Sequence, residues 1–275
     1  MSDKHQTVSG FAEIAGAPVF YEVAGAGHPL LLLHAGVADS RMWDDQWALF
    51  AQHYRVIRCD LPGYGQSSIP DREFALHEIV AGLLGHLNVE RAHVAGASWG
   101  GRVALDFALA HPEKVAKLVL VCPSVGGEKP SAAVERFGEE EEALLERGDL
   151  AAATELNLRM WVDGPHRAPG QVDPSVRERV RVMQHHAFTI PTPLGAELIH
   201  IDPPAIERLA EVRVPTLVVV GDLDIAEKLA MAERLAAEIP GACQVVIPGA
   251  AHMVTMERPE EFNRVILDFL SRAPL

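Results

Sequence analysis

The sequence predicts an α/β fold in which helices flank a mostly parallel β-sheet. Short apolar segments alternate with amphipathic helical segments along most of the 275 residues. Several apolar segments, such as residues 29–34 and 115–122, are continuous runs, which are typical of strands buried on both faces. Between residues 124 and 203 the chain is instead helical, charged and interrupted by prolines. The alternation favours right-handed crossovers, and the interruption indicates a helical insertion between two strands.

The first half of the chain supplies most of the expected elements. Residues 11–15 and 19–23, with a glycine and a proline between them, predict an antiparallel hairpin. Residues 61–67 are dense in turn formers and follow an expected strand. The further strands expected here are 29–34, 55–60, 91–95 and 115–122, and the expected helices are about 74–87 and 102–110.

The alternation resumes in the last quarter of the chain. The elements expected there are strand 214–221, helix 226–239, strand 244–247 and helix 259–270. We therefore expect a core domain made of residues 1–123 and 204–275, with residues 124–203 as an inserted helical cap. The chain length suits one large domain with such an insertion.

The composition excludes several classes of partner. A net charge of -14 argues against a nucleic-acid surface. No apolar segment is long enough to span a bilayer, and residues 1–6 lack the apolar core of a secretory signal. The acidic run of residues 139–142 predicts one solvated helix face, with repulsion of anionic ligands as the alternative. We expect a cytoplasmic protein that acts on a small molecule, with no nucleic-acid or membrane partner; the sequence leaves its oligomeric state open.

Three cysteines stand far apart in apolar, strand-like surroundings: Cys59, Cys122 and Cys243. Their odd number and their contexts predict buried free thiols, which suits a reducing compartment. The adjacent His185 and His186 in the expected cap have no accompanying carboxylate or cysteine set, so we expect them on a helix surface and predict no metal site.

Residues 96–101, Gly-Ala-Ser-Trp-Gly-Gly, stand between an expected strand and an expected helix. A serine at such a corner, with glycine two residues before and after it, is typical of a nucleophile elbow. The tight corner requires small neighbours, exposes the Oγ of Ser98, and places the next N–H at a helix N-terminus, where it can stabilise an oxyanion. The alternative is a glycine-rich turn in an ordinary α/β protein.

A nucleophilic serine needs a base, usually a histidine oriented by a carboxylate. Of the 13 histidines, His252 lies just after the last expected strand, and Asp224 follows the strand before it. Ser98, Asp224 and His252 are therefore all expected in loops at the carboxyl edge of one sheet, where open parallel sheets form their sites.

Five segments together carry a family resemblance. They are His34-Ala35-Gly36, residues 60–67 (Asp-Leu-Pro-Gly-Tyr-Gly-Gln-Ser), the elbow at 96–101, residues 221–224 (Gly-Asp-Leu-Asp) and residues 249–252 (Gly-Ala-Ala-His). With them, nearly the whole chain resembles the capped, esterase-like α/β-hydrolases, in particular enol-lactone hydrolases, arylesterases and acyl-homoserine lactonases. The resemblance implies a mostly parallel eight-stranded sheet.

The resemblance also implies roles for the site residues. Ser98 would be the nucleophile, His252 the general base and then acid, and Asp224 the orienting carboxylate, with Asp222 as the competitor for that last role. The oxyanion hole would use the N–H groups of Trp99 and Gly36. Ala35 stands where most members have glycine, so the N–H of Val37 is the other candidate.

Structural roles are expected for His34, which would brace the oxyanion loop, and for Asp60. Candidates for lining the substrate pocket are Val37, Trp99, Met160, Trp161 and Met253. For Met160 and Trp161, packing within the cap is the alternative.

These features predict a serine hydrolase that cleaves a carboxylic ester or lactone through an acyl-enzyme, with no metal or organic cofactor. Two alternatives stay open. The same triad on this fold can cleave carbon–carbon bonds or act as a lyase, and a hydrolase-like receptor can bind a lactone with little turnover.

Overall fold

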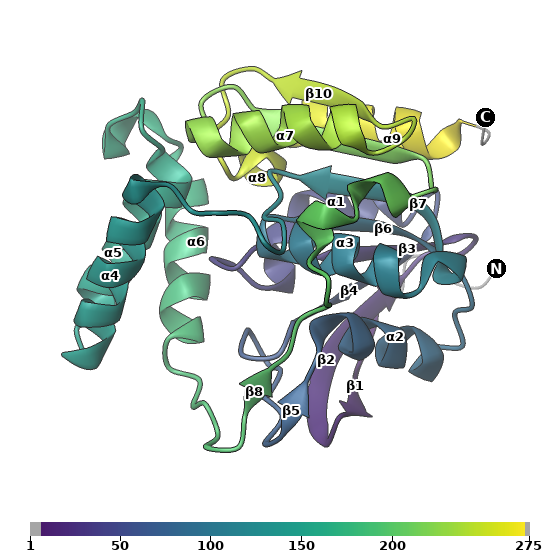
Figure 1. Ribbon diagram of the computed structural model, residues 1–275, viewed down its shortest axis with the longest axis horizontal. Coiled ribbons are helices and arrows are strands. Elements are labelled where there is room, and N and C mark those ends of the chain that lie inside the picture. The colour runs from purple at the N-terminus through teal and green to yellow at the C-terminus, as the bar shows by residue number, and fades with distance from the viewer. Residues whose placement is uncertain (1–6, 273–275) are drawn as a thin grey trace.

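The computed structural model describes residues 7–272, so the first six residues, where we expect no secretory signal, lie outside it (Figure 1). Eight strands form one sheet in the order β1-β2-β4-β3-β6-β7-β9-β10. The bounds of these strands are β1 Val8–Ile14, β2 Ala17–Ala24, β3 Pro29–Leu33, β4 Arg55–Cys59, β6 Ala92–Ala97, β7 Val115–Val121, β9 Thr216–Gly221 and β10 Cys243–Ile247. The predicted fold class is confirmed.

The sheet is antiparallel only at its first edge. The β1–β2 and β2–β4 pairs are antiparallel, and every later pair from β4 to β10 is parallel. Strands β6, β7 and β9 are almost wholly buried because helices cover both faces, which explains their continuous apolar sequences. Parallel pairing brings the carboxyl ends of β6, β9 and β10 to one edge.

The helices fall into a core set and a cap set. In the core, α1 packs against α9, and α2 packs against α3. The core helices are α1 Asp44–Phe50, α2 Leu76–His86, α3 Trp99–Ala110, α7 Ala226–Glu238, α8 Val254–Glu257 and α9 Pro259–Ser271.

Three helices lie between β7 and β9: α4 Ala132–Glu146, α5 Leu150–Asn157 and α6 Pro174–Ala187, with a π-helical segment, Leu158–Asp163, after α5. Figure 1 shows α4, α5 and α6 grouped beside the sheet rather than over its faces. The chain returns to the core through β8, Glu197–Leu198, which pairs in parallel with β5, Glu73–Phe74. Each strand of this ladder has only two residues, of which the first is an exposed glutamate, so no apolar run marks it in the sequence.

The cysteine prediction requires one correction. Cys59 and Cys122 are buried free thiols as expected, but Cys243 is exposed. It is the first residue of β10, the last strand of the sheet, where one side of the strand has no neighbour. Among residues 7–272, no helix combines the length and apolar character that a membrane crossing requires.

Candidate active site

Ser98 occupies the corner between β6 and α3 in a strained conformation, with φ 50° and ψ -111°. Backbone hydrogen bonds hold it there. Its N–H donates to the carbonyl of Val121 at 2.8 Å, and its own carbonyl accepts from Arg102 and Ser124, both at 3.1 Å. A non-glycine residue persists at positive φ only where its surroundings fix it, and such strain is common at functional sites.

The expected need for small residues around Ser98 has a direct steric cause. A Cβ on Gly96 would collide with the carbonyl oxygen of Gly100. A Cβ on Gly100 would lie 2.5 Å from the carbonyl oxygens of both Leu33 and His34. Helix α3 can therefore approach β6 and β3 at this corner only without side chains at the two glycines.

His252 and Asp224 form a buried pair. The Nδ1 atom of His252 lies 2.8 Å from Oδ2 of Asp224, and the two side chains are 2% and 1% exposed. Burial opposes ionisation of Asp224, but His252 and the backbone N–H of Ile225, 2.8 Å from Oδ1, offset it. The pKa of Asp224 therefore lies below its usual value, and Nε2 is the ring nitrogen of His252 left for proton transfer.

Asp222, the competitor for the acidic role, has a different partner. Its Oδ1 accepts the N–H of Gly249 at 2.7 Å, which ties the loop after β9 to the loop that carries His252. At Gly221 a Cβ would collide with the carbonyl oxygens of Ala250 and Ala251, so the same two loops also approach closely there. Asp222 thus positions the loop, whereas Asp224 contacts the imidazole.

A buried thiol lies beside this pair. The Cys122 sulfur and one ligand atom each of Asp224 and His252 lie within 4.8 Å of one another, the one such group of three among the described residues. Burial, and next the charge of Asp224, raise the pKa of the Cys122 thiol. A protonated thiol is a poor metal ligand, and the Asp224–His252 hydrogen bond already uses two of the donor atoms.

His185 and His186 are exposed on α6, and the Nε2 atom of His186 lies 2.9 Å from the carbonyl oxygen of Gly65.

Ser98 and His252 line the same cavity, of about 250 Å³. Its core wall also contains Gly36, Val37 and Tyr64. Its cap wall, from the helices between β7 and β9, consists of Phe137, Glu141, Asn157, Trp161, Gln184 and Phe188. The ring of Trp161 packs on that of His252, with 4.7 Å between centroids, and the ring of Phe137 lies edge-on to Trp161.

Two of the predicted pocket residues, Val37 and Trp161, therefore line the cavity, whereas Met160 and Met253 do not. Met253 is 1% exposed and packs in the hydrophobic core. Met160 precedes Trp161 in a helical segment, where consecutive side chains point in different directions, so only one of the two can face the cavity.

The predicted oxyanion donors are neighbours. A Cβ on Gly36 would lie 3.4 Å from the Cβ of Trp99, so the two backbone segments meet beside Ser98. Trp99 is the first residue of α3, and the N–H of a first helical residue has no acceptor within its helix. Gly36 lines the cavity, whereas Trp99, which is also a predicted pocket residue, does not.

His34 links the loop after β3, which carries Gly36, to the neighbouring loop after β4. Its Nε2 accepts the N–H of Leu61 at 2.9 Å, so its Nδ1 donates to the carbonyl of Ala35 at 2.8 Å. Burial lowers the pKa of His34, which keeps the ring neutral, as this pattern of one donor and one acceptor requires. Asp60 accepts the N–H groups of Ser40 and Gln66.

The prediction that residues 139–142 form only a solvated face was wrong at one position. Glu139, Glu140 and Glu142 are exposed, but Glu141 lines the cavity. The cap wall repeats one spacing, an aromatic and a polar residue four apart: Phe137 with Glu141, Trp161 with Asn157, and Phe188 with Gln184. Residues four apart share a helix face, so this pairing is the sequence signal that could have identified these three polar residues.

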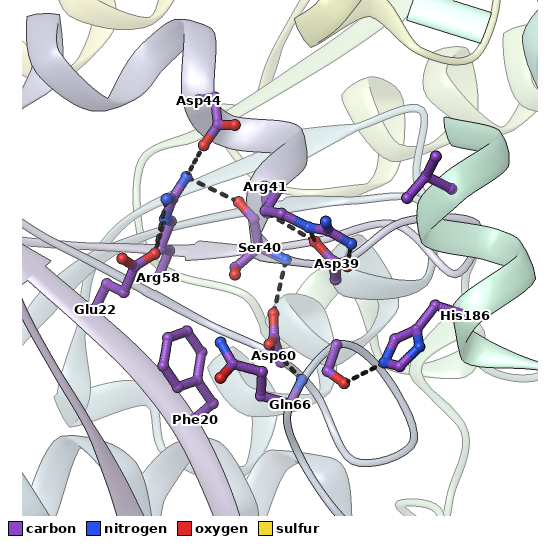
Figure 2. Close-up of a pocket in the computed structure, with 12 residues that line it drawn as sticks. Phe20, Glu22, Asp39, Ser40, Arg41, Asp44, Arg58, Asp60, Gln66 and His186 are labelled. Atoms are coloured by element: carbon purple, nitrogen blue, oxygen red, sulfur yellow. Dashed lines mark hydrogen bonds and ion pairs between the residues drawn. The ribbon is translucent and has the colours of Figure 1, made fainter. Parts of the chain in front are cut away.

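Figure 2 shows a second and larger cavity, about 660 Å³, where α6 meets the loops after β3 and β4. Its arginines pair with carboxylates, and Asp60 accepts two backbone N–H groups. Arg58 bridges Glu22 and Asp44, and Arg41 binds Asp39 (Figure 2). Because these charges are neutralised within the protein, the cavity offers no group set apart for a ligand.

The comparisons with known proteins agree with this fold. A model of the alpha/beta hydrolase fold matches residues 28–259, so the chain belongs to the α/β-hydrolase family. A relative in Caulobacter sp. strain K31 bears the name carbamate hydrolase RutD. It is 28% identical over 96% of this chain and 97% of its own length.

Two further relatives differ in the reaction that they are named for. The 2-hydroxy-6-oxononadienedioate/2-hydroxy-6-oxononatrienedioate hydrolase of Cupriavidus pinatubonensis is 30% identical over 90% of this chain and 88% of its own length. A solved structure of Est816, described as an N-acyl homoserine lactone degrading enzyme, superimposes with a TM-score of 0.74. That structure is 27% identical and covers 94% of this chain and 100% of its own.

Proposed function

We propose that the protein hydrolyses a carboxylic ester or lactone of a small molecule through an acyl-enzyme intermediate. The observation that carries this proposal is the buried His252–Asp224 hydrogen bond, 2.8 Å long, at a cavity that Ser98 also lines. A serine on a strained corner, an imidazole and an oriented carboxylate are the groups that acyl transfer requires.

In the proposed first step, Ser98 Oγ attacks the carbonyl carbon while Nε2 of His252 takes its proton. The carbonyl oxygen becomes an oxyanion, for which the N–H groups of Gly36 and Trp99 are the proposed donors. The C–O bond then breaks, and the imidazolium returns the proton to the leaving alcohol. Asp224 stays ionised throughout and stabilises the imidazolium. One oxyanion donor typically contributes about 3 kcal/mol to the barrier reduction.

In the second step, His252 takes a proton from water, and the resulting hydroxide attacks the acyl carbon. As the second tetrahedral intermediate collapses, the bond from the acyl carbon to Ser98 Oγ breaks and the imidazolium returns its proton to Oγ, which releases the carboxylic acid and restores Ser98. A lactone follows the same steps, except that its alcohol and acid remain parts of one product.

Carbon–carbon hydrolysis is the alternative that the relative from Cupriavidus pinatubonensis favours. That relative is named for dicarboxylate substrates, whose two negative charges call for cationic partners. Within the described residues, the cavity at Ser98 has no lysine or arginine in its lining and contains the carboxylate of Glu141. This charge distribution supports a neutral ester or lactone over a dicarboxylate.

Turnover of three substrates tests the proposal: p-nitrophenyl butyrate, N-hexanoyl homoserine lactone and 2-hydroxy-6-oxo-6-phenylhexa-2,4-dienoate. We expect hydrolysis of the first two, and a loss of at least about 10³-fold in kcat in Ser98→Ala. Cleavage of the dienoate alone would establish the carbon–carbon alternative. Ligand-induced stabilisation by the lactone without turnover would instead indicate a receptor.

A matched pair of aspartates tests the acidic role. Asp224→Asn should lower kcat by roughly 10³–10⁴-fold, because an amide favours the wrong tautomer of His252 and cannot stabilise the imidazolium. Asp222→Asn keeps a carbonyl oxygen for the N–H of Gly249 and should cost less than about tenfold. Equal losses in the two variants would refute the assignment of Asp224.

A further inference from the structure

The cap wall of the cavity holds a carboxylate that the protein itself orients. Asn157, which is 3% exposed, donates its side-chain amide to Glu141 and also to the carbonyl of Ala153 at 3.0 Å. Glu141 is half-buried, and its burial raises its pKa, which the hydrogen bond from Asn157 partly opposes. The carboxylate is thus fixed on the cavity side of α4 and keeps further acceptor positions.

A second polar group of the cap wall has no partner in the protein. Gln184 is 4% exposed, and its Oε1 is fully enclosed without a hydrogen-bond partner among residues 7–272. Leaving a buried amide oxygen unpaired costs free energy, and a donor on a bound molecule can supply the missing hydrogen bond once the side chain turns this oxygen toward the cavity. Gln184 comes from α6 and lines the same cavity as Glu141, Ser98 and His252.

The charges around these two groups have one sign. Within the described residues, Glu141 supplies the only carboxylate of the lining, and no lysine or arginine neutralises it there. In the core wall, Tyr64 has its pKa raised to about 12, first by burial and then by the charge of Glu141. The hydroxyl of Tyr64 therefore stays protonated and uncharged. The carboxylate of Glu141 keeps the cavity electronegative.

We propose that Glu141 and Gln184 form a subsite that binds a hydrogen-bond donor of the substrate, such as an ammonium, hydroxyl or amide N–H group, and that rejects a carboxylate. The inference rests on the proposed function, because the donor must lie on the same molecule as the carbonyl that Ser98 attacks. It goes further by defining the substrate class as neutral or cationic esters and lactones with a donor in the part of the molecule that faces the cap.

Three esters of equal chain length test the subsite: p-nitrophenyl hexanoate, p-nitrophenyl 6-aminohexanoate and mono-p-nitrophenyl adipate. The protein should prefer the amino ester to the hexanoate in kcat/KM and the hexanoate to the adipate. The ammonium gains a charge-assisted hydrogen bond to Glu141 that a methyl group cannot make, and the carboxylate is repelled by Glu141, so we expect each of the two kcat/KM ratios to be about tenfold. Glu141→Gln should reduce both ratios to within about threefold of one.

A matched control lies on the same helix. Glu140 is exposed and does not line the cavity, so Glu140→Gln removes the same charge from the chain and should leave both ratios unchanged. In Gln184→Met, which keeps the side-chain length, we expect the ratio of kcat/KM for the amino ester to that for the hexanoate to fall about fivefold. Equal ratios in the parent, Glu141→Gln and Glu140→Gln proteins would overturn the inference.

A binding measurement separates failure of the subsite from failure of the proposed function. In the Ser98→Ala protein, hexylammonium should bind more tightly than hexanoate, and Glu141→Gln should remove that difference, whether or not any ester is cleaved. If the esters are not hydrolysed but the binding preference is present, the proposed function is wrong and the subsite stands. If hexanoate binds as tightly as hexylammonium, the subsite is wrong, whatever the turnover.

Discussion

Two buried aspartates show how neighbouring groups set the ionisation of one kind of side chain. Asp224 is held below its usual pKa despite its burial, because His252 and a backbone N–H stabilise its charge. Asp106 on α3 is also buried, but its Oδ1 has no partner among the described residues, and Arg102 approaches its other oxygen only to 3.8 Å. Burial therefore dominates at Asp106 and raises its pKa to about 6.

The raised pKa of Asp106 makes a prediction about stability and pH. The folded state holds the proton of this group more tightly than the unfolded state, so stability is lost as the pH rises from about 4 to about 6. Asp106→Asn should therefore raise the free energy of unfolding by about 1–2 kcal/mol near pH 8 and have little effect near pH 4. Urea unfolding at the two pH values measures the difference. A gain of the same size at both would show that the charge of Asp106 is not its cause.

Glycines have opposite effects in helices α3 and α4. Gly100, in the first turn of α3, lies against the carbonyl oxygens of Leu33 and His34, so that helix and strand β3 touch through backbone alone. Gly138, in the middle of α4, has nothing within 4 Å of where a Cβ would stand. The first glycine is required by packing, and the second only adds freedom to the unfolded chain.

Alanine at each glycine tests this contrast. Gly138→Ala should stabilise the protein by about 0.5–1 kcal/mol, because alanine favours the helix and nothing obstructs it. Gly100→Ala should destabilise it by at least about 2 kcal/mol and displace Ser98, with a parallel loss of activity. Thermal unfolding and ester turnover of the two variants report both effects. A Gly100→Ala protein as stable and active as the parent would contradict the steric account of the elbow.

The sequence predicted the core elements better than the cap. The core strands are continuous apolar runs, and the residues after β6, β9 and β10 are predicted to meet because parallel strands end at one edge. The cap wall depends on how α4 and α6 are turned, which is set by tertiary packing rather than by local pattern. In the sequence, only its spacing from Phe137 distinguishes Glu141 from its three glutamate neighbours, and the orientation of α4 places it at the cavity. Gln184 likewise has no local signal beyond its spacing from Phe188.

The ion pair between Arg167 and Glu257 joins the cap to the loop of His252. Arg167 donates to Glu257 at 2.5 Å and to the carbonyls of Val162 and Asp163. The other oxygen of Glu257 accepts the N–H of Ala251, the residue before His252. The two paired side chains are 11% and 6% exposed, so this contact is shielded from solvent.

Breaking this pair should affect both stability and catalysis. Arg167→Met leaves the buried carboxylate of Glu257 without its cation, and we expect a loss of about 3 kcal/mol in the free energy of unfolding with a lower kcat/KM. Arg159→Met is the control, because Arg159 pairs with Glu155 on the exposed surface and should matter by less than about 0.5 kcal/mol. Recovery of stability in Arg167→Met/Glu257→Gln would identify the unpaired charge as the cause. Equal effects at Arg159 and Arg167 would exclude the pair as a link between cap and site.

The cavity at Ser98 is built from two separate parts of the chain. The groups proposed to make and break bonds follow β6, β9 and β10, while Glu141, Asn157 and Gln184 all belong to a single continuous insertion. A lineage could therefore exchange that one segment and change which molecules are accepted without disturbing the reacting atoms. Recombination between relatives at the borders of the insertion should consequently transfer selectivity as a unit.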